Sequence, residues 1–119
     1  MRTVHVALVE NDPSLNRAYS RLLRARGYTV TSYSSAEEFL ACGADGCDCL
    51  VLDIDLDGMS GLALQRLLRA ENRLVPIVFI TGGDDAATQS QAHAQDCKGY
   101  ISKPFTSAQL CAAIKVALR

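Results

Sequence analysis

Five short apolar stretches, each followed by residues with the apolar spacing of a helix, most constrain how this chain can fold. Residues 4–9 and 77–80 are almost entirely apolar, which is typical of strands covered on both faces. Strands that alternate with helices favour a parallel sheet between two layers of helices, joined by right-handed crossovers. We therefore predict an α/β, doubly wound fold with a five-stranded parallel sheet and five helices.

Residues that favour helix ends predict where the helices begin. Asp12 can cap a first helix in which Pro13 takes the first position. Ser35 and Glu38 match a capping box for a short second helix, and Ser60 can cap a third. The helices are therefore predicted to follow the apolar stretches closely, with short loops between them.

The remaining elements follow from local patterns. Gly27 is predicted to end the first helix, and the alternating residues 28–33 suit a strand at the sheet edge. Residues 49–52 and 100–101 are predicted as the third and fifth strands. Residues 84–96 can be helical, but they are rich in alanine and should be the least firmly held element. The residues predicted to face the core are Leu15, Ala18, Tyr19, Leu22 and Leu23 in the first helix, Leu64, Leu67 and Leu68 in the third, and Leu110, Ala113, Ile114, Ala117 and Leu118 in the last.

Length and charge limit the classes of function. A chain of 119 residues fits one domain, which we assign to residues 1–119. The formal net charge of −1 gives no general attraction to nucleic acid or to an anionic membrane. No apolar run approaches the roughly 20 residues needed to cross a bilayer, and the first residues lack the apolar stretch of a signal peptide. A cytoplasmic location is expected.

Cysteines and histidines do not predict a metal site. The five cysteines are odd in number and lack zinc-ligand spacing, so we expect reduced and mostly buried thiols. His5 and His93 have no partner at ligand spacing, and structural or surface roles are expected for both.

Polar residues follow four of the predicted strands, at the edge where a doubly wound sheet binds its ligands. Carboxylates brought together there repel one another unless a cation or a lysine offsets their charge. Mg²⁺ prefers such oxygen ligands. A carboxylate such as Asp53 can also attack phosphorus, while a metal, a hydroxyl such as Thr81 and an ammonium such as Lys103 neutralise the transferring group. The residues at these strand ends are Glu10, Asn11 and Asp12, then Asp53 and Asp55, then Thr81, and last Lys103.

Five motifs, in this order and at this spacing, make the chain resemble a response-regulator receiver domain over essentially its whole length. They are the group Glu10-Asn11-Asp12-Pro13, the segment 52–61 around Asp53, Thr81, Tyr100, and the group Lys103-Pro104-Phe105. The resemblance implies a flavodoxin-like sheet with strand order 2-1-3-4-5, helices on both faces and a cis bond before Pro104. The roles that it implies are phosphoacceptor for Asp53, switch hydroxyl for Thr81, rotating aromatic residue for Tyr100, phosphate-binding ammonium for Lys103, and an Mg²⁺ site of Glu10, Asn11, Asp53 and the backbone carbonyl of Asp55.

The same resemblance implies a function in signalling. Members of the family take a phosphoryl group from a histidine kinase, and the surface of the fourth helix, fifth strand and fifth helix changes when they do. We therefore expect a phosphorylation-dependent switch of a two-component system, with no enzymatic activity beyond its own phosphorylation and dephosphorylation. Expected partners are a histidine kinase or phosphotransfer protein and a downstream output domain or a second copy of the chain. Direct binding of nucleic acid or membrane by this domain is not expected.

Two residues depart from the family pattern. The family usually has two adjacent acids after the first strand, and the second binds the metal, whereas here Glu10 is followed by Asn11. A neutral amide oxygen at that place predicts weaker Mg²⁺ binding. Asp57 replaces a proline that is common in the loop after the phosphoacceptor, and it adds a charge nearby.

The sequence leaves alternatives open. Asn11 also suits a degenerate receiver that binds partners without being phosphorylated. Asp53 and Asp55 suit a small hydrolase or phosphatase that uses them as nucleophile and acid. Asp12 can be a helix cap alone, and Tyr100 a half-buried aromatic residue of an edge strand. Three arginines of the first helix are either a solvated face or a docking surface for a kinase: Arg17, Arg21 and Arg24.

Overall fold

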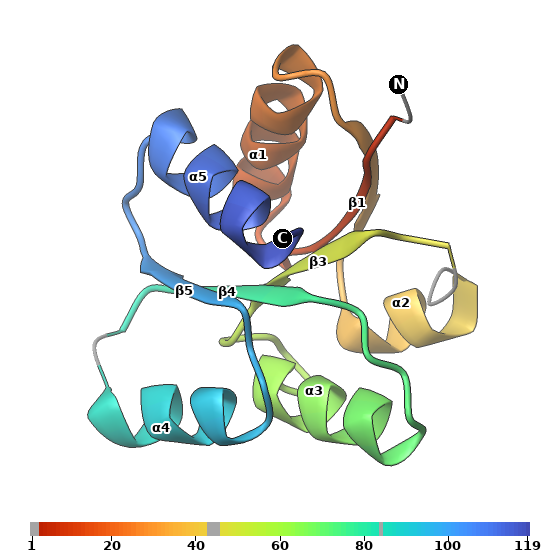
Figure 1. Ribbon diagram of the computed structural model, residues 1–119, viewed down its shortest axis with the longest axis vertical. Helices are drawn as coiled ribbons and strands as arrows, with labels where there is room; N and C mark the ends of the chain where they lie inside the picture. Colours follow the sequence, from red (N-terminus) through yellow and green to blue (C-terminus); the bar gives the residue numbers. More distant parts are fainter. Residues whose placement is uncertain (1–2, 43–45, 84) are drawn as a thin grey trace.

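Five parallel strands form one sheet in the order β2-β1-β3-β4-β5 in the computed structural model, which describes residues 3–42, 46–83 and 85–119. Figure 1 shows the strands alternating with helices along the chain. The α/β, doubly wound fold and its strand order are therefore confirmed. The elements are β1 His5–Val9, α1 Pro13–Ala25, β2 Thr29–Tyr33, α2 Ala36–Cys42, β3 Cys49–Asp53, α3 Gly61–Ala70, β4 Ile77–Thr81, α4 Ala86–Ala94, β5 Gly99–Ser102 and α5 Ser107–Ala117.

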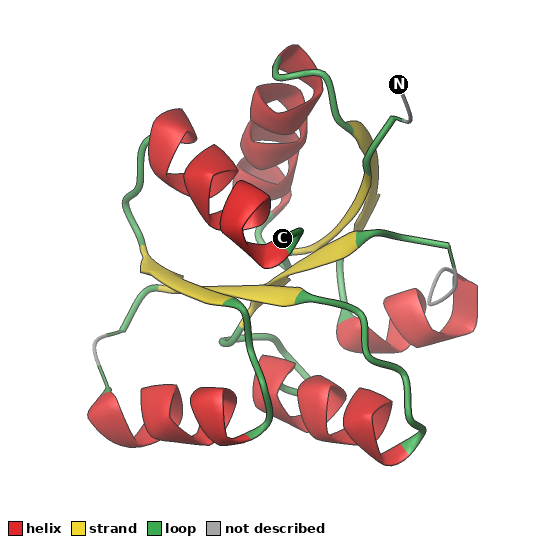
Figure 2. Cartoon of the chain, viewed as in Figure 1, coloured by secondary structure: helices red, strands yellow, loops and turns green. Residues whose placement is uncertain are grey.

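The sheet separates two layers of helices. Figure 2 shows α1 and α5 on one face and α2, α3 and α4 on the other. Leu8, Leu23 and Ile114 belong to the core on the α1/α5 side, and Phe39 and Phe79 to the core on the opposite side. Every residue of β3 and β4 is buried, which agrees with their apolar sequences. Each core holds one layer of helices against the sheet, so the strand ends are fixed from both sides.

Helix caps occur where the sequence places them. The Asp12 carboxylate accepts hydrogen bonds from the backbone of the first turn of α1, and Ser60 caps α3 in the same way. The Ser35 hydroxyl accepts from the Glu38 amide at 3.0 Å, but the Glu38 carboxylate accepts from the Ser34 amide instead of closing the box on Ser35. A capping box between Thr106 and Gln109 at the start of α5 was not predicted.

Helical spacing alone placed some side chains wrongly. Ala18 of α1 is exposed and Ser20 is buried, because the face of α1 that meets the sheet is turned toward Ser20 and Leu23. Leu67 is only half-buried, whereas the polar Gln65 of α3 is completely buried. The helix predicted within residues 84–96 is confirmed for α4, which Asp85 caps, while residue 84 lies outside the described residues.

Other expectations concern thiols and membranes. All five cysteines lie in the described ranges and none of them forms a disulfide, and Cys49, Cys97 and Cys111 are buried. No helix within those ranges is long and apolar enough to cross a membrane.

Gly61 allows α3 to begin directly against the end of β3. A Cβ atom at Gly61 would overlap the backbone carbonyl oxygen of Asp53 and lie 2.9 Å from the Cα of Ile54. The Gly61 amide donates to the Ile54 carbonyl at 3.1 Å, which closes the loop between β3 and α3. The position of that loop therefore depends on the absence of a side chain at residue 61.

We expect Gly61→Ala to lower the free energy of unfolding by about 1–3 kcal/mol, because the added methyl group forces backbone atoms apart. Urea unfolding followed by circular dichroism measures the change. Gly82→Ala is the matched control, since a Cβ there meets nothing within 4 Å, and it should change stability by less than about 1 kcal/mol. An equal loss in both variants would contradict the steric explanation.

Candidate functional site

The ends of β1, β3 and β5 bring three charged side chains together. Glu10 follows β1, Asp53 ends β3 and Lys103 follows β5. Glu10 and Asp53 are only 1% and 2% exposed, although they come from different strands. The sequence-based expectation that these residues converge at one edge of the sheet is confirmed for these three side chains.

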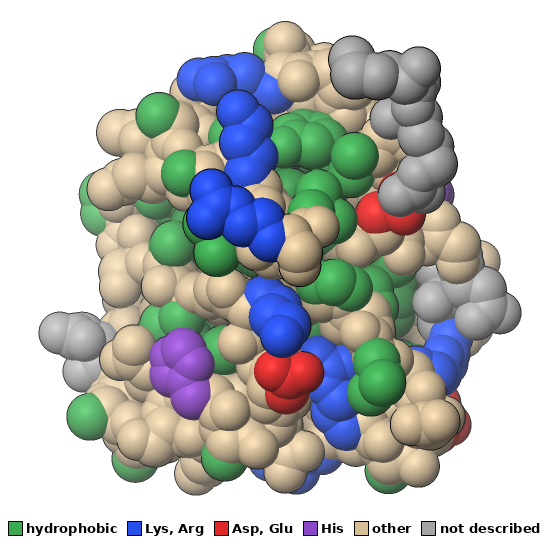
Figure 3. All heavy atoms as spheres, in the orientation of Figure 1, with side chains coloured by type: hydrophobic (Ala, Val, Ile, Leu, Met, Phe, Trp, Pro, Cys, Tyr) green, Lys and Arg blue, Asp and Glu red, His purple; other side chains and the backbone are tan. Residues whose placement is uncertain are grey.

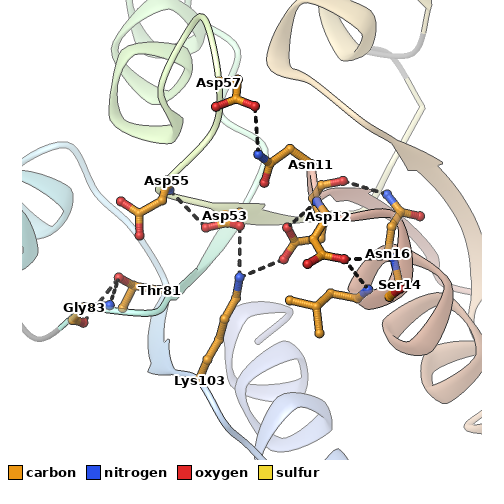
Figure 4. A network of polar contacts seen from close by, with 12 residues as sticks. Asn11, Asp12, Ser14, Asn16, Asp53, Asp55, Asp57, Thr81, Gly83 and Lys103 are labelled. Carbon is orange, nitrogen blue, oxygen red and sulfur yellow. Dashed lines mark hydrogen bonds and ion pairs between the residues drawn. The ribbon is translucent and has the colours of Figure 1, made fainter.

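The Lys103 ammonium bridges the two carboxylates. Its Nζ donates to Glu10 Oε1 at 2.8 Å and to Asp53 Oδ2 at 3.0 Å. Figure 4 shows the Lys103 side chain pointing toward Asp53. The Lys103 amide donates to the Thr81 carbonyl at 2.7 Å, and the following bond to Pro104 is cis, as the resemblance implied. The hydrogen bond from the Lys103 amide holds the backbone after β5 against the end of β4.

The outer oxygens of the same carboxylates accept backbone hydrogen bonds. The Asp55 amide donates to Asp53 Oδ1 at 3.0 Å, and the Asp12 amide donates to Glu10 Oε2 at 3.0 Å. The Asn16 side chain donates to the Glu10 carbonyl at 3.0 Å and so ties α1 to the end of β1. Each oxygen of the two buried carboxylates therefore has a donor, which a buried charge requires.

The pKa of Asp53 is raised from 3.8 to about 6, mainly because burial penalises the charged form. The neighbouring Glu10 carboxyl contributes to this rise, while the Asp55 amide and the Lys103 ammonium oppose it. Partial burial lowers the pKa of Lys103, but its hydrogen bonds to Glu10 and Asp53 outweigh that effect, so the net pKa is raised. Lys103 thus stays cationic beside a carboxylate that is held ionised at a cost.

The Thr81 hydroxyl and the Tyr100 ring contact residues outside this cluster. Thr81 ends β4, and its hydroxyl accepts from the Gly83 amide at 3.1 Å, on the side away from Lys103 in Figure 4. The half-buried Tyr100 ring lies 6.3 Å from the Phe79 ring and 6.2 Å from the His93 ring, measured between ring centroids. Tyr100 therefore connects β5 to α4 instead of joining the carboxylates.

Asn11 and Asp57, the two residues that depart from the family pattern, are in contact, which was not predicted from the sequence. Asn11 Nδ2 donates to Asp57 Oδ2 at 3.3 Å. Glu37 of α2 was missed altogether, yet its carboxylate accepts from the Met59 amide at 3.0 Å and holds the loop between β3 and α3. Both contacts join segments far apart in the sequence, so local patterns carry no signal for them.

The oxygen atoms at this edge suit a hard cation. Asp53 and Glu10 offer carboxylates, Asn11 an amide oxygen and Asp55 a backbone carbonyl, which are ligand types that Mg²⁺ accepts together with several waters. In the described part of the chain, no group of three His, Cys, Asp or Glu side chains is arranged to hold a metal by itself. The oxygen types at this edge, neutral ones included, therefore match those that Mg²⁺ accepts.

Three exposed arginines lie along the first helix, α1. Arg17, Arg21 and Arg24 are exposed, and Figure 3 shows basic side chains over α1 and α5 on the face that it presents. Arg24 also donates to the Val30 carbonyl at 3.2 Å, which ties the end of α1 to β2. The exposure of these three residues fits both alternatives, a solvated face and a docking surface.

Comparisons with known proteins agree with this geometry. Residues 6–115 match the family model of the response regulator receiver domain. The chain is 34% identical to response regulator protein TodT of Pseudomonas putida, covering 96% of this chain and 51% of TodT. It is 38% identical to nodulation protein W of Bradyrhizobium diazoefficiens, covering 94% of this chain and 50% of that protein, so it spans about half the length of both relatives. The crystal structure of FixJ-N superposes with a TM-score of 0.91 at 29% identity, covering 99% of this chain and 95% of that one.

We expect the raised pKa of Asp53 to make the protein lose stability as the pH rises from about 4 to about 7. In this range the folded state keeps a proton that the unfolded state has released, so folding becomes less favourable with increasing pH. The loss should be about 1–3 kcal/mol, because a shift of one pKa unit corresponds to about 1.4 kcal/mol and the rise of the Asp53 pKa from 3.8 to about 6 sets the upper value. Urea unfolding in EDTA at several pH values, compared between wild type and Asp53→Asn, isolates the contribution. Parallel pH profiles for the two proteins would contradict it.

Proposed function

Since the chain belongs to the response regulator receiver domain family, we propose that it is a phosphorylation-driven switch in which Asp53 accepts the phosphoryl group. Supporting this proposal is the placement of Asp53, which is buried at the end of β3 between the Lys103 ammonium and the Asp55 amide. The donor would be a phosphohistidine of a histidine kinase or a phosphotransfer protein. Receiver domains of two-component response regulators work as such switches.

The chemistry is a transfer between two nucleophiles. An Asp53 carboxylate oxygen forms a bond to phosphorus, the bond from phosphorus to the donor imidazole nitrogen breaks, and that nitrogen keeps the electron pair. The Lys103 ammonium neutralises the phosphoryl oxygens, and the Thr81 hydroxyl donates to one of them after leaving Gly83. When bound, Mg²⁺ would neutralise the remaining charge of the transferring group.

Residues of this chain would hold the cation on the carboxylate side of the site. The proposed ligands are Asp53, the Asn11 side-chain oxygen, the Asp55 carbonyl and Glu10, either directly or through water. Because Asn11 is neutral, we propose that Mg²⁺ binds less tightly than it would to a second acid at that position.

A surface beyond the site would carry the signal. Tyr100 lies between Phe79 of β4 and His93 of α4, and α4 buries only Ala92 among its residues. We propose that movement of Thr81 toward a phosphorylated Asp53 alters the Tyr100 ring and thereby the surface of α4, β5 and α5. A downstream output domain or a second copy of the chain would recognise this change in the cytoplasm, and this domain itself would bind neither nucleic acid nor a membrane.

Two other functions make different predictions. A degenerate receiver, motivated by Asn11, would bind its partners without being phosphorylated. A small phosphatase would need Asp55 as a general acid, but the Asp55 side chain is exposed and its contact with Asp53 is made by the backbone amide. The favoured function therefore depends on Asp53 and not on the carboxylate of Asp55.

We expect incubation with acetyl phosphate and Mg²⁺ to add the mass of one phosphoryl group to the intact protein. Asp53→Asn should abolish the adduct, because an amide nitrogen and oxygen cannot replace the attacking carboxylate. Intact-protein mass spectrometry measures the adduct.

Asp55→Asn is the matched control, since it removes an acid two residues away but leaves the backbone amide in place. This variant should still form the adduct. No adduct on the wild-type protein would favour the degenerate receiver, whereas turnover of small phosphate esters that Asp55→Asn abolishes would favour the phosphatase.

We expect Thr81→Val to retain the adduct but to lose the response of Tyr100, because the hydroxyl that links site and surface is missing. The measurement is the change in Tyr100 ring signals by NMR on addition of beryllofluoride and Mg²⁺. Thr81→Ser keeps a hydroxyl and should retain most of the change. An unaltered response in Thr81→Val would show that the signal reaches Tyr100 by another route.

A further inference from the structure

We propose that Asp57 supplies the carboxylate that the Mg²⁺ site lacks at position 11, so that Asn11 and Asp57 act as one unit in holding the cation. The inference rests on the proposed function, because it concerns the same site. It extends that function by assigning a role to a residue outside the ligand set expected from the sequence.

The contact between the two side chains fixes how Asn11 is oriented. Asn11 Nδ2 lies 3.3 Å from Asp57 Oδ2, and an ionised carboxylate can only accept a hydrogen bond. The amide must therefore present its NH₂ group to Asp57. The side-chain oxygen of Asn11 then points away from Asp57 and toward Asp53, as Figure 4 shows. Asp57 thus aims a neutral oxygen ligand at the place where the cation would bind.

The loop between β3 and α3 holds Asp57 beside the site. The Leu56 amide donates to the Ile54 carbonyl at 3.1 Å, and the Met59 amide donates to Glu37 Oε2 at 3.0 Å. Gly58 between them has a φ of 73°, a conformation that suits glycine. A side chain at Gly58 would meet the Glu37 carboxylate at 2.6 Å. Contacts on both sides of Asp57 therefore hold it against Asn11.

Charge balance favours a cation on this side of Asp53. Lys103 offsets one of the two negative charges of Glu10 and Asp53 from one side, and the Asn11–Asp57 pair lies on the opposite side of the Asp53 carboxylate in Figure 4. Among the residues that the structure describes, no lysine or arginine forms an ion pair with Asp57. The negative charge that an acid at position 11 would bring is thus present, but it comes from the loop after β3.

The test is the dissociation constant of Mg²⁺ without a phosphodonor, measured by following backbone amide signals in a ¹⁵N NMR titration. Asp57→Asn should weaken binding roughly tenfold, the effect expected when a carboxylate that supports a metal ligand is removed. Asp12→Asn is the matched control, because it removes one acid beside the site and asparagine still caps α1. It should change the constant less than about twofold, because the exposed Asp12 carboxylate accepts from the first turn of α1, where solvent screens its charge. Equal weakening by both variants would overturn the proposal, since only general charge would then matter.

A second variant tests whether the two positions act as a unit. Asn11→Asp combined with Asp57→Asn exchanges the acid and the amide, and it should restore the wild-type dissociation constant within about threefold. Asn11→Asp alone places two acids in contact, so it should lower the melting temperature in EDTA and recover it in Mg²⁺. Failure of the exchange to restore binding would overturn the proposal.

The outcomes also separate this inference from the proposed function. If wild type and Asp57→Asn bind Mg²⁺ equally and both form the Asp53 adduct, only the role of Asp57 is wrong. If the wild-type protein shows no saturable Mg²⁺ binding, the role of Asp57 and the metal part of the proposed function are both wrong.

Discussion

The ion pairs of Lys103 are the interaction on which the rest of the site depends. Glu10 and Asp53 are two buried carboxylates that would repel each other and lose hydration without a cation between them. Lys103 lies 93 residues after Glu10 and 50 residues after Asp53 in the chain, so both contacts are long-range. Because β5 pairs only with β4 in the sheet, the lysine reaches the carboxylates only when β1, β3, β4 and β5 are in place. The charge balance of the site therefore requires four strands that come from the whole length of the chain.

Much of the site could be predicted from the sequence because its charged residues lie at the ends of the strands. In a parallel sheet the carboxyl ends of neighbouring strands lie at one edge, whatever the loops do. Locating the strand ends was thus enough to bring Glu10, Asp53 and Lys103 together. The helix starts were predictable for a similar reason, since Asp12 and Ser60 cap the backbone of their own first turns. The strand order itself came only from the family resemblance.

What could not be predicted depends on contacts between distant segments. Gln65 is a polar residue on a helix and was not expected in the core, yet its amide donates to the carbonyls of Ala92 at 2.9 Å and Gln95 at 3.2 Å. The pairing of Asn11 with Asp57 spans 46 residues and depends on the course of a loop. The direction of the Thr81 hydroxyl depends on the rotamer that its side chain adopts. Periodicity and capping rules describe neighbours along the chain, so they contain no information on these three features.

The weakly packed α4 links these unpredicted contacts to the proposed switch. Gln65 and Arg69 of α3 both donate to backbone carbonyls at the C-terminal end of α4, which fixes that end although α4 buries only Ala92. The opposite end of α4 follows Gly82 and Gly83, and Thr81 holds Gly83 through its hydroxyl. In the proposed switch, a change in the partner of Thr81 would therefore act on the end of α4 that α3 does not fix. Polar contacts thus give an alanine-rich helix a defined position at its C-terminal end, and the proposed switch would act at the opposite end.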